Sequence, residues 1–316
     1  MSPKVSICIP AYKRVAFLKK ALQSVLEQSY NDYEIIVTDD TPDNSVEELL
    51  KEFEFNGKLK YYHNSNSLGS PDNWNLAVSK AEGEYVKILH CDDYFTSSDS
   101  LGKYVELMER NPDSDFGFSS TLIVSIPGNI KKAFIFDEKH FNRIKSDPYY
   151  LFFRNMIGAP SATIYRRTCN MKYDSNLKWI VDIDLYIAFI QANKNIANTK
   201  DVLICTVDGG EGQITQSVMI DKDIQIREHI YIFNKFLDRG AKLDLEKFHL
   251  FFQILFYQYK VKDIAEIDAI FKIPDNLRPF FDKVFVSLHK RMLWTRIKIK
   301  LYNTAINKKL LKLEVY

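Results

Sequence analysis

Residues 5–45 read VSICIPAYKRVAFLKKALQSVLEQSYNDYEIIVTDDTPDNS, and two kinds of pattern alternate along this stretch. Val5–Ile9 and Tyr33–Thr38 are short runs of apolar, β-branched residues, as expected of strands buried on both faces. Between them, Val15–Gln28 carries apolar residues at spacings of three and four, which predicts a helix with one buried face. We expect the first strand to stop at Pro10, because proline has no N–H to donate. The stretch therefore predicts a strand–helix–strand unit of a parallel sheet.

The same alternation continues to about residue 110. The predicted strands are Leu59–His63 and Tyr85–Leu89, and the predicted helices are Val46–Phe53, Asp72–Ala81 and Leu101–Arg110. Right-handed crossovers would join these units into a doubly wound α/β sandwich with helices on both faces of the sheet. Ligands of such sheets bind beyond the carboxyl ends of the strands, so the polar residues after each strand are the candidates for a site.

The rest of the chain has a mixed pattern that becomes helical. Further strands are predicted at Phe116–Ile126, Ala133–Phe136, Ser161–Arg166 and Val202–Val207, and helices at Asp147–Asn155 and Ile183–Gln191. From Ile220 the pattern is mostly helical, through Leu250–Tyr259, Ile264–Phe271 and a long final helix. We therefore predict an α/β domain over residues 1–216 and a helical C-terminal region over residues 217–316.

The composition is that of a folded protein without a strong overall charge. Hydrophobic residues make up 46% of the 316, enough for a full core, which excludes general disorder. The formal net charge of +2 argues against an obligate nucleic-acid-binding protein. The start of the chain does not read as a signal peptide, and no apolar stretch is long enough to span a bilayer. The four cysteines form no Cys-x-x-Cys pair, which suits the reducing cytoplasm. Because no predicted segment spans a bilayer, we expect a soluble or peripheral protein.

Residues 283–316 concentrate positive charge. They hold nine Lys or Arg and one Glu, a net charge of +8, which leaves −6 for residues 1–282 because the whole chain carries +2. Apolar residues recur at near-helical spacing from Leu288 to Leu313. Such a helix fits an anionic membrane surface, where each basic residue contributes about 1 kcal/mol of attraction. A helix docked on the domain with a solvated basic face explains the same pattern.

The turn after the first strand carries Pro10 and Tyr12. A dinucleotide-binding unit would place G-x-G-x-x-G here, but no glycine occurs before Gly57, which excludes the hydride-transfer interpretation. Tyr12 is placed to stack on a flat ligand such as a nucleobase. Packing beside the strand end is the alternative for this tyrosine.

Two pairs of adjacent carboxylates follow later strands. Asp39 and Asp40 come after the second strand, where they can accept hydrogen bonds from a base or from ribose hydroxyls, or can instead start the turn or cap the next helix. Asp92 and Asp93 follow the fourth strand. Carboxylate oxygens suit Mg²⁺ or Mn²⁺, and such a metal would bridge the phosphates of a nucleotide.

Three blocks of the sequence, taken in order, resemble the family-2 glycosyltransferases, which have the GT-A fold, a Rossmann-like sandwich. The first block is residues 5–45, with its Pro-x-Tyr strand end and its E-I-I-V-x-D-D run. The second, NWNLAVSKAEGEYVKILHCDDYF at residues 73–95, is similar to the segment around the family's D-x-D metal motif. The third joins Gly158–Ala162 to Trp179–Tyr186 and looks like the acceptor loop and the catalytic-base helix. The resemblance covers residues 4 to about 216.

The resemblance implies a role for each candidate residue. Pro10 and Tyr12 would line the nucleobase pocket, Asp39 would contact the base, Asp40 would support the strand end, and Asp92 and Asp93 would hold the ribose and the divalent metal. Asp182 would be the general base that deprotonates the acceptor hydroxyl. An inverting transfer needs one such carboxylate opposite the leaving group. Asp184, two residues later on the same helix, is expected to stabilise the helix N-terminus instead.

Two positions depart from the family pattern. His90 stands where many relatives have Asp, which affects the expected ribose contact, and a partly buried histidine at a strand end is the alternative. Gly209-Gly210 stand where relatives often carry a His that contributes to the metal or diphosphate site. Metal binding would then be weaker, or another group would hold the diphosphate.

These observations lead to one hypothesis and two alternatives. We expect an inverting, metal-dependent glycosyltransferase that moves a sugar from a nucleotide-diphosphate donor, a UDP-sugar first of all, to a glycan or lipid-linked glycan in surface polysaccharide synthesis. The cofactor would be Mn²⁺ or Mg²⁺, and the protein would be cytoplasmic, with residues 283–316 available to an anionic inner membrane face. A nucleotide-sugar-binding protein without catalysis and a peripheral membrane scaffold are the alternatives. Nucleic acid is not an expected partner.

Overall fold

The computed structural model describes residues 2–125, 130–209 and 218–290. The chain divides into two compact units, one of residues 1–177 with 181–211, the other of residues 178–180 with 212–316. The boundary predicted between residues 216 and 217 lies outside the described residues. So do the turn at residues 126–129 and most of the basic tail, residues 291–316.

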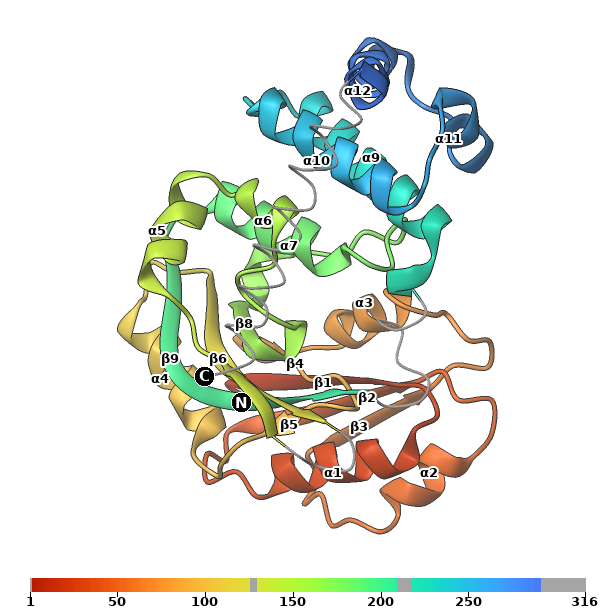
Figure 1. Cartoon of the computed structure of the whole chain (residues 1–316). Helices are drawn as coiled ribbons and strands as arrows, with labels where there is room; N and C mark the ends of the chain where they lie inside the picture. Colours follow the sequence, from red (N-terminus) through yellow and green to blue (C-terminus); the bar gives the residue numbers. More distant parts are fainter. Residues whose placement is uncertain (1, 126–129, 210–217, 291–316) are drawn as a thin grey trace. The chain divides into compact units, whose positions relative to one another are not determined.

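A mixed sheet forms the centre of the first unit (Figure 1). Within the described residues it has nine strands, eight of them in the order β3-β2-β1-β4-β8-β6-β9-β5, with β7 paired to β6. The strands are β1 (Val5–Ala11), β2 (Tyr33–Asp39), β3 (Leu59–His63), β4 (Tyr85–Ile88), β5 (Tyr94–Phe95), β6 (Phe116–Ser125), β7 (Ile130–Phe134), β8 (Thr163–Arg166) and β9 (Ile196–Asp208).

The parallel half of the sheet is the one predicted from the alternation of strands and helices. Strand β1 pairs in parallel with β2 and with β4, and β2 pairs in parallel with β3. The predicted end of the first strand at Pro10 is wrong, because β1 continues to Ala11. Its pairing register with β4 ends at Cys8, so Pro10 lies where only β2 still pairs with it. Proline is tolerated at such a strand end because one side of the ladder has stopped.

The second half of the sheet brings in antiparallel strands. Strand β8 is antiparallel to both β4 and β6, while β9 is parallel to β6 and antiparallel to the two-residue β5. Strand β9 begins at Ile196, earlier than the predicted Val202, and the register of its pairing with β6 shifts near Ser119 and Ser120. These irregular pairings extend the sheet beyond the part that the strand–helix alternation predicted.

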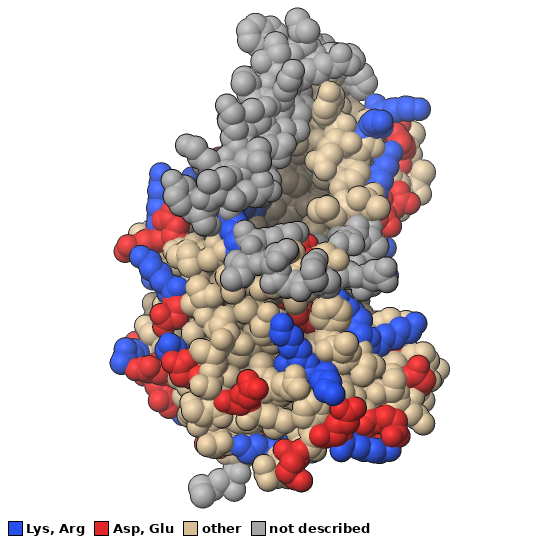
Figure 2. Space-filling view, turned by 60° about the horizontal axis from the view of Figure 1, so that its bottom comes forward, with Lys and Arg blue, Asp and Glu red and all other residues tan. Residues whose placement is uncertain are grey.

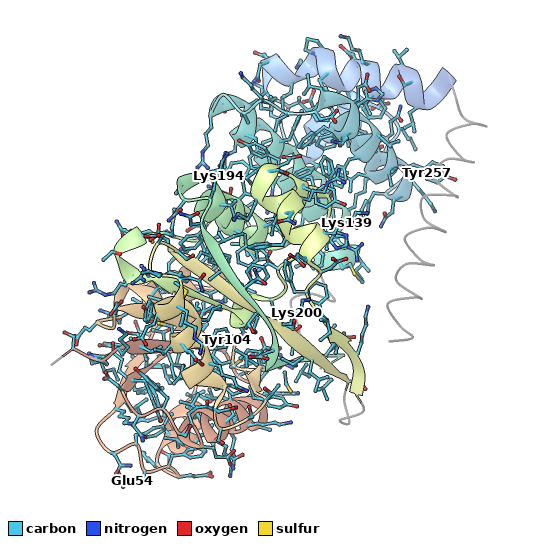
Figure 3. All side chains as sticks on the ribbon, turned by 90° about the vertical axis from the view of Figure 1, so that its left-hand side faces the viewer. Glu54, Tyr104, Lys139, Lys194, Lys200 and Tyr257 are labelled. Atoms are coloured by element: carbon cyan, nitrogen blue, oxygen red, sulfur yellow. The ribbon has the colours of Figure 1, made fainter. Side chains whose placement is uncertain are left out.

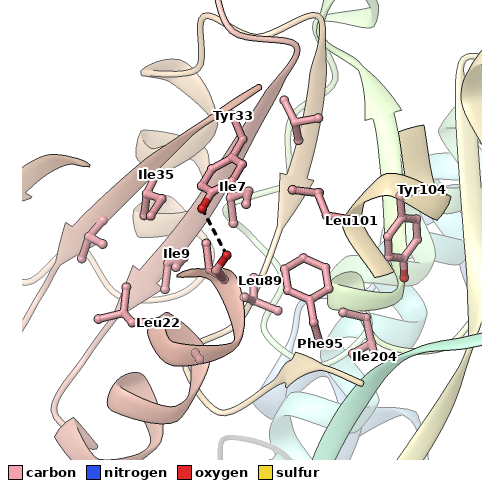
Figure 4. Packing of buried hydrophobic residues seen from close by; sticks show 14 of the residues in the cluster. Ile7, Ile9, Leu22, Tyr33, Ile35, Leu89, Phe95, Leu101, Tyr104 and Ile204 are labelled. Carbon is pink, nitrogen blue, oxygen red and sulfur yellow. Dashed lines mark hydrogen bonds between the residues drawn. The ribbon is translucent and has the colours of Figure 1, made fainter. Parts of the chain in front are cut away.

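Helices cover both faces of the sheet, as a doubly wound fold requires. The helices of this unit are α1 (Val15–Leu26), α2 (Ser45–Leu50), α3 (Asp72–Ser79), α4 (Ser100–Arg110), α5 (Glu138–Ser146), α6 (Tyr150–Phe153) and α7 (Val181–Ala192), with short 3₁₀ turns η1 (Pro160–Ala162) and η2 (Arg167–Cys169). Buried residues of α1, α2 and α4 pack on Val5, Ile7 and Ile9 of β1 (Figure 4). In the same cluster the Tyr33 hydroxyl donates a hydrogen bond to the Val25 carbonyl. Alternate residues of β1 face the other way, where the Cys8 thiol lies 3.5 Å from the Ala77 carbonyl of α3.

The region between β7 and β8 differs from its prediction. One helix was expected at Asp147–Asn155, but α5 comes before it and α6 covers only Tyr150–Phe153. Asp137 caps α5, since its side chain accepts a hydrogen bond from the Lys139 N–H. The helix ends at Ser146, two residues before Pro148, where helices commonly stop.

The second unit is helical, as predicted. Its helices are α9 (Lys222–Asp238), α10 (Leu245–Gln258), α11 (Ile264–Ile270) and α12 (Arg278–Lys290), with the 3₁₀ turn η3 (Asp275–Leu277). Asp221, Asp244 and Asp263 cap α9, α10 and α11 through their side chains. Clustered phenylalanine rings form the core, with Phe233 4.8 Å from Phe248 and 5.3 Å from Phe252 between ring centroids.

Surface charge and helix length can be compared with what the sequence led us to expect. Acidic and basic side chains are mixed on the face that Figure 2 presents, rather than gathered by sign. Among the described residues, every helix is too short or too polar to span a bilayer.

Candidate active site

The carboxyl ends of β1, β2 and β4 meet at one edge of the sheet because these strands are parallel and in register. The chain leaves β1 through Tyr12, Lys13 and Arg14. Tyr12 is 50% exposed, and the Lys13 ammonium lies 5.0 Å from the centre of its ring. The Lys13 N–H donates to the Thr41 hydroxyl at 2.7 Å, which ties the turn after β1 to the turn after β2. An exposed aromatic ring at this edge fits the stacking role predicted for Tyr12.

Asp39 is fully buried and both of its oxygens are engaged. One accepts from the Thr41 N–H at 2.8 Å, and the other accepts from the Tyr61 hydroxyl at 2.9 Å. Burial raises the pKa of Tyr61 above its usual range, and the Asp39 charge adds to that effect. The role of Asp39 toward a base remains a prediction.

Asp40 braces a loop. Its carboxylate accepts hydrogen bonds from the Asn64 amide at 2.8 Å, the Leu68 N–H at 3.1 Å and the Gly69 N–H at 2.8 Å. Gly69 has φ +73°, a conformation that favours glycine. Three donors from residues 64–69 therefore converge on one carboxylate at the strand end.

The two aspartates after β4 have different surroundings. Asp92 is partly exposed, and its Oδ2 lies 2.5 Å from Nη1 of Arg14. Asp93 is 5% exposed, and its carboxylate accepts from the Ser161 side chain and the Val207 backbone. Burial, together with the smaller effect of the Asp92 charge, raises the pKa of Asp93 to about 8. Asp92 is therefore the better placed of the pair to meet a ligand.

His90 contacts the aromatic residues beside these aspartates. Its ring lies 4.4 Å from Trp74, and Trp74 lies 5.2 Å from Tyr173 in an edge-to-face arrangement. Its backbone N–H donates to the Ser161 hydroxyl at 2.9 Å. Burial lowers the pKa of His90 to about 4, despite the opposing effect of Asp92, so the imidazole is neutral at physiological pH.

Asp182 lies in the first turn of α7. Its Oδ2 accepts from the Asn155 amide at 2.9 Å, and its Oδ1 accepts from the Ile183 N–H at 2.9 Å. Burial raises the pKa of Asp182 to about 7, although these hydrogen bonds oppose the rise. The Asp182 charge in turn raises the pKa of Tyr173, after the larger effect of burial. Through Tyr173 and Trp74, Asp182 is linked to the sheet edge that carries His90 and Asp92.

Asn155 is a site residue that the sequence did not single out. Its amide nitrogen donates to Asp182 and to the Gly158 carbonyl, and its amide oxygen accepts from the N–H groups of Ile157 and Gly158, at 2.9–3.0 Å. Gly158 has φ +103°, which favours glycine. The spacing Asn-x-x-Gly before the expected acceptor loop was the available clue.

Lys87 is a second residue that the sequence did not reveal. It is fully buried in β4, and its ammonium donates to the carbonyls of Ile88 and Ser161. Burial lowers its pKa to about 7, while Asp93 acts in the opposite direction. The ammonium lies 4.6 Å from the ring of Tyr104, which Figure 3 labels. The Tyr104 hydroxyl donates to the Ala162 carbonyl at 3.1 Å. Lys87 thus fastens η1 to the strand that leads to Asp92.

The remaining residues considered in the sequence are Pro10, Asp184, Gly209 and Gly210. Pro10 lies within β1, and Asp184 is buried in the first turn of α7. Gly209 has φ +93°, while Gly210 and the loop up to residue 217 lie outside the described residues. Among the described residues, no three His, Cys, Asp or Glu side chains group together as ligands for a metal ion. Asp92 fits a cation only as part of a ligand set completed by a substrate, which is common for Mg²⁺.

A doubly wound sheet of this kind, with a helical C-terminal region, is the GT-A-like fold. The chain belongs to glycosyl transferase family 2, whose family model matches residues 6–173. It is 31% identical over 192 residues to an uncharacterised glycosyltransferase of Methanocaldococcus jannaschii, covering 60% of this chain and 65% of that protein.

Further relatives and solved structures extend this similarity. The chain is 29% identical over 134 residues to the GalNAc(5)-diNAcBac-PP-undecaprenol beta-1,3-glucosyltransferase of Campylobacter jejuni, 42% of each protein. It thus spans less than two thirds of the length of both curated relatives. The structure of S. aureus TarS 1–349 in complex with UDP-GlcNAc has a TM-score of 0.60 and 17% identity, covering 90% of this chain and 81% of that one. The structure of the Pyrobaculum calidifontis mannosyltransferase PcManGT in complex with GDP-Man and Mn²⁺ has a TM-score of 0.54 and 13% identity. The match covers 100% of this chain and 81% of that one.

Proposed function

We propose that this protein is an inverting glycosyltransferase that moves a hexosyl or N-acetylhexosaminyl group from a UDP-sugar to a hydroxyl of a glycan or lipid-linked glycan. The observation that carries the proposal is Asp182, a carboxylate with a pKa near 7, held by Asn155 and linked to the edge that carries Asp92. A general base works best when its pKa lies near the working pH. Family membership and the donor in the TarS complex support the donor class.

The proposed reaction assigns a step to each group. Asp182 accepts the proton of the acceptor hydroxyl while that oxygen attacks the anomeric carbon from the face opposite the diphosphate. The bond between the anomeric carbon and the diphosphate oxygen breaks, and UDP leaves with the electron pair. Tyr12 and Asp39 hold the base, and Asp40 keeps the loop of residues 64–69 in place beside it. Neutral His90 contacts Trp74, which in turn contacts Tyr173 near Asp182.

Asp92, with Asp93 behind it, would hold a divalent cation, Mn²⁺ or Mg²⁺. When bound, the cation supplies Lewis-acid stabilisation of the leaving diphosphate. The partial exposure of Asp92, whose Oδ2 also pairs with Arg14, supports this assignment. The burial of Asp93 leaves it less available, so Asp92 would be the principal ligand.

The relatives and the basic tail support a proposal for the acceptor and the place of action. One relative is named for action on an undecaprenol-linked glycan, and a Bacillus subtilis relative is a putative teichuronic acid biosynthesis glycosyltransferase. We propose that the protein works at the inner face of the cell membrane, with residues 283–316 near anionic lipid. Flotation with anionic vesicles, with and without these residues, tests this part, and equal flotation would contradict it.

A donor panel tests the activity. Release of UDP or GDP from common nucleotide sugars is followed with Mn²⁺, Mg²⁺ or EDTA, for the parent chain and for Asp182→Asn. We expect metal-dependent release from one UDP-sugar, lost in Asp182→Asn. Calorimetric titration of UDP with Mn²⁺ is run beside it, because water is a poor acceptor. Binding without turnover, even with glycan acceptors supplied, would favour the non-catalytic alternative, and absence of nucleotide binding would overturn the proposal.

A further inference from the structure

Arg14 occupies an unusual place between β1 and α1. Lys13 and Arg14 both have positive φ, +54° and +48°, a conformation that costs roughly 1–2 kcal/mol for a residue other than glycine. Arg14 is the residue before the first turn of α1, and that turn has neither an acidic residue nor a side-chain cap. The backbone therefore holds the arginine at the sheet edge at some cost in stability.

Two contacts fix the direction of the guanidinium group. Its Nη1 lies 2.5 Å from Oδ2 of Asp92, and its Cζ lies 4.2 Å from the centre of the Phe17 ring. The Arg14 side chain is only 14% exposed. Packing on an aromatic face holds the plane of a guanidinium and leaves its in-plane N–H groups available as donors.

The other two nitrogens of Arg14 have no acceptor. Nε and Nη2 are buried, and neither has a hydrogen-bond partner among the described residues. Arg166, with a comparably buried side chain, shows what a structural arginine does here. Its Nε donates to the Ser114 carbonyl, its Nη1 to Glu84 and its Nη2 to the Pro112 carbonyl, at 2.8–3.2 Å. Buried charged donors without acceptors are costly, so the Arg14 donors call for an anionic ligand.

We propose that Arg14 binds the diphosphate of the sugar donor and stabilises the negative charge of the leaving nucleotide. The inference rests on the proposed function, since Asp92 is where the cation and the diphosphate are expected to meet. The planar fork of Nε and Nη2 matches two phosphate oxygens, as arginine does in phosphate sites.

The test separates the diphosphate from the nucleoside. UDP and uridine are titrated calorimetrically into the parent chain, Arg14→Gln and the matched control Arg166→Gln, once with Mn²⁺ and once with EDTA. We expect Arg14→Gln to lose at least about tenfold in UDP affinity under both conditions, because a charge-assisted hydrogen bond is lost. Uridine affinity should stay within about twofold, and Arg166→Gln should bind both ligands like the parent.

Each outcome decides the matter. A loss confined to UDP supports the assignment, whereas an equal loss for UDP and uridine, or no loss, makes Arg14 only a structural partner of Asp92 and overturns it. If Arg14→Gln does not fold, Arg14→Lys is read in the same way, because lysine keeps the charge but not the two-pronged donor. Failure of the parent chain to bind UDP would count against the proposed function itself, not against Arg14 alone.

Discussion

At Asp182 two opposing effects set the acidity of one carboxyl group. Burial raises its pKa, and hydrogen bonds from Ile183 and Asn155 lower it, leaving a value of about 7. The family resemblance marked Asp182 as a candidate in the sequence. It did not mark Asn155 or Arg14, because their contacts depend on which side chains the folded loops bring within hydrogen-bond distance.

The pH dependence of turnover follows from Asp182. A general base must be unprotonated, so kcat should rise with pH and level off, with a midpoint at about pH 7. Initial rates of sugar transfer between about pH 5 and 9, with UDP affinity measured beside them, check this. A midpoint near the ordinary aspartate value of about 4 would contradict the assignment of Asp182.

Replacing Asn155 should move that midpoint upward. Its amide donates to the charged form of Asp182, so Asn155→Ala removes a stabilising bond and raises the pKa of the carboxyl further. We expect kcat at neutral pH to fall roughly threefold to tenfold, with the rising limb displaced to higher pH. Asn193→Ala is the control, since Asn193 bonds Asp115 at 2.8 Å elsewhere in the same unit. An unchanged pH profile for Asn155→Ala would be evidence against this role.

At the scale of elements, the parallel half of the sheet could be predicted within a few residues. Its strands are apolar on both faces and its helices have one apolar face, so period alone distinguishes them. The antiparallel additions could not be predicted. Strand β5 has two residues, and the early part of β9 contains polar residues such as Asn198 and Lys200. Pairing of β5 with β9, and of β9 with β6, makes these segments strands, and pairing is not visible in a local pattern.

Gly83 lies just before β4, where the backbone packs closely against Val5 and Ser6 of β1. A methyl group there would lie 2.7 Å from the Ser6 nitrogen and 2.8 Å from the Val5 carbonyl carbon, both backbone atoms. We expect Gly83→Ala to lower the free energy of unfolding by about 1–3 kcal/mol, measured by urea denaturation. Gly102→Ala, in helix α4, is the control, because among the described residues outside that helix the new methyl group would have Tyr30 Cβ as its neighbour, at an ordinary 3.7 Å. That variant should gain about 0.5–1 kcal/mol, and equal losses in both would contradict the packing argument.

For the whole molecule, the chain passes between the two units more than once. Residues 178–180, immediately before α7, belong with the helical unit although α7 itself belongs to the first. There the fully buried Glu228 of α9 accepts hydrogen bonds from the N–H groups of Lys178, Trp179 and Ile180 at 2.8–3.2 Å. The predicted division into two consecutive domains did not include this return, because a lone glutamate in an amphipathic helix gives no sign of its partner.

Because three backbone N–H groups donate to its carboxylate, Glu228 should contribute strongly to the free energy of unfolding. Glu228→Gln keeps the shape but places an N–H₂ group against backbone donors, so unfolding by urea should become easier by about 1–3 kcal/mol. Glu246→Gln, an exposed change on α10, should alter stability by less than about 0.5 kcal/mol. Similar small effects for both would mean that these three bonds add little.

The bracing of residues 64–69 by Asp40 has a consequence for the energetics of encounter. Because three donors already hold this loop on one carboxylate, little conformational entropy remains to be lost when a nucleoside arrives. Under the proposed function, recognition at this end should be close to lock-and-key, with backbone shifts below about 1 Å. Association would then be limited by orientation rather than by folding of a loop, and differences in affinity between nucleosides would lie mainly in their dissociation rates.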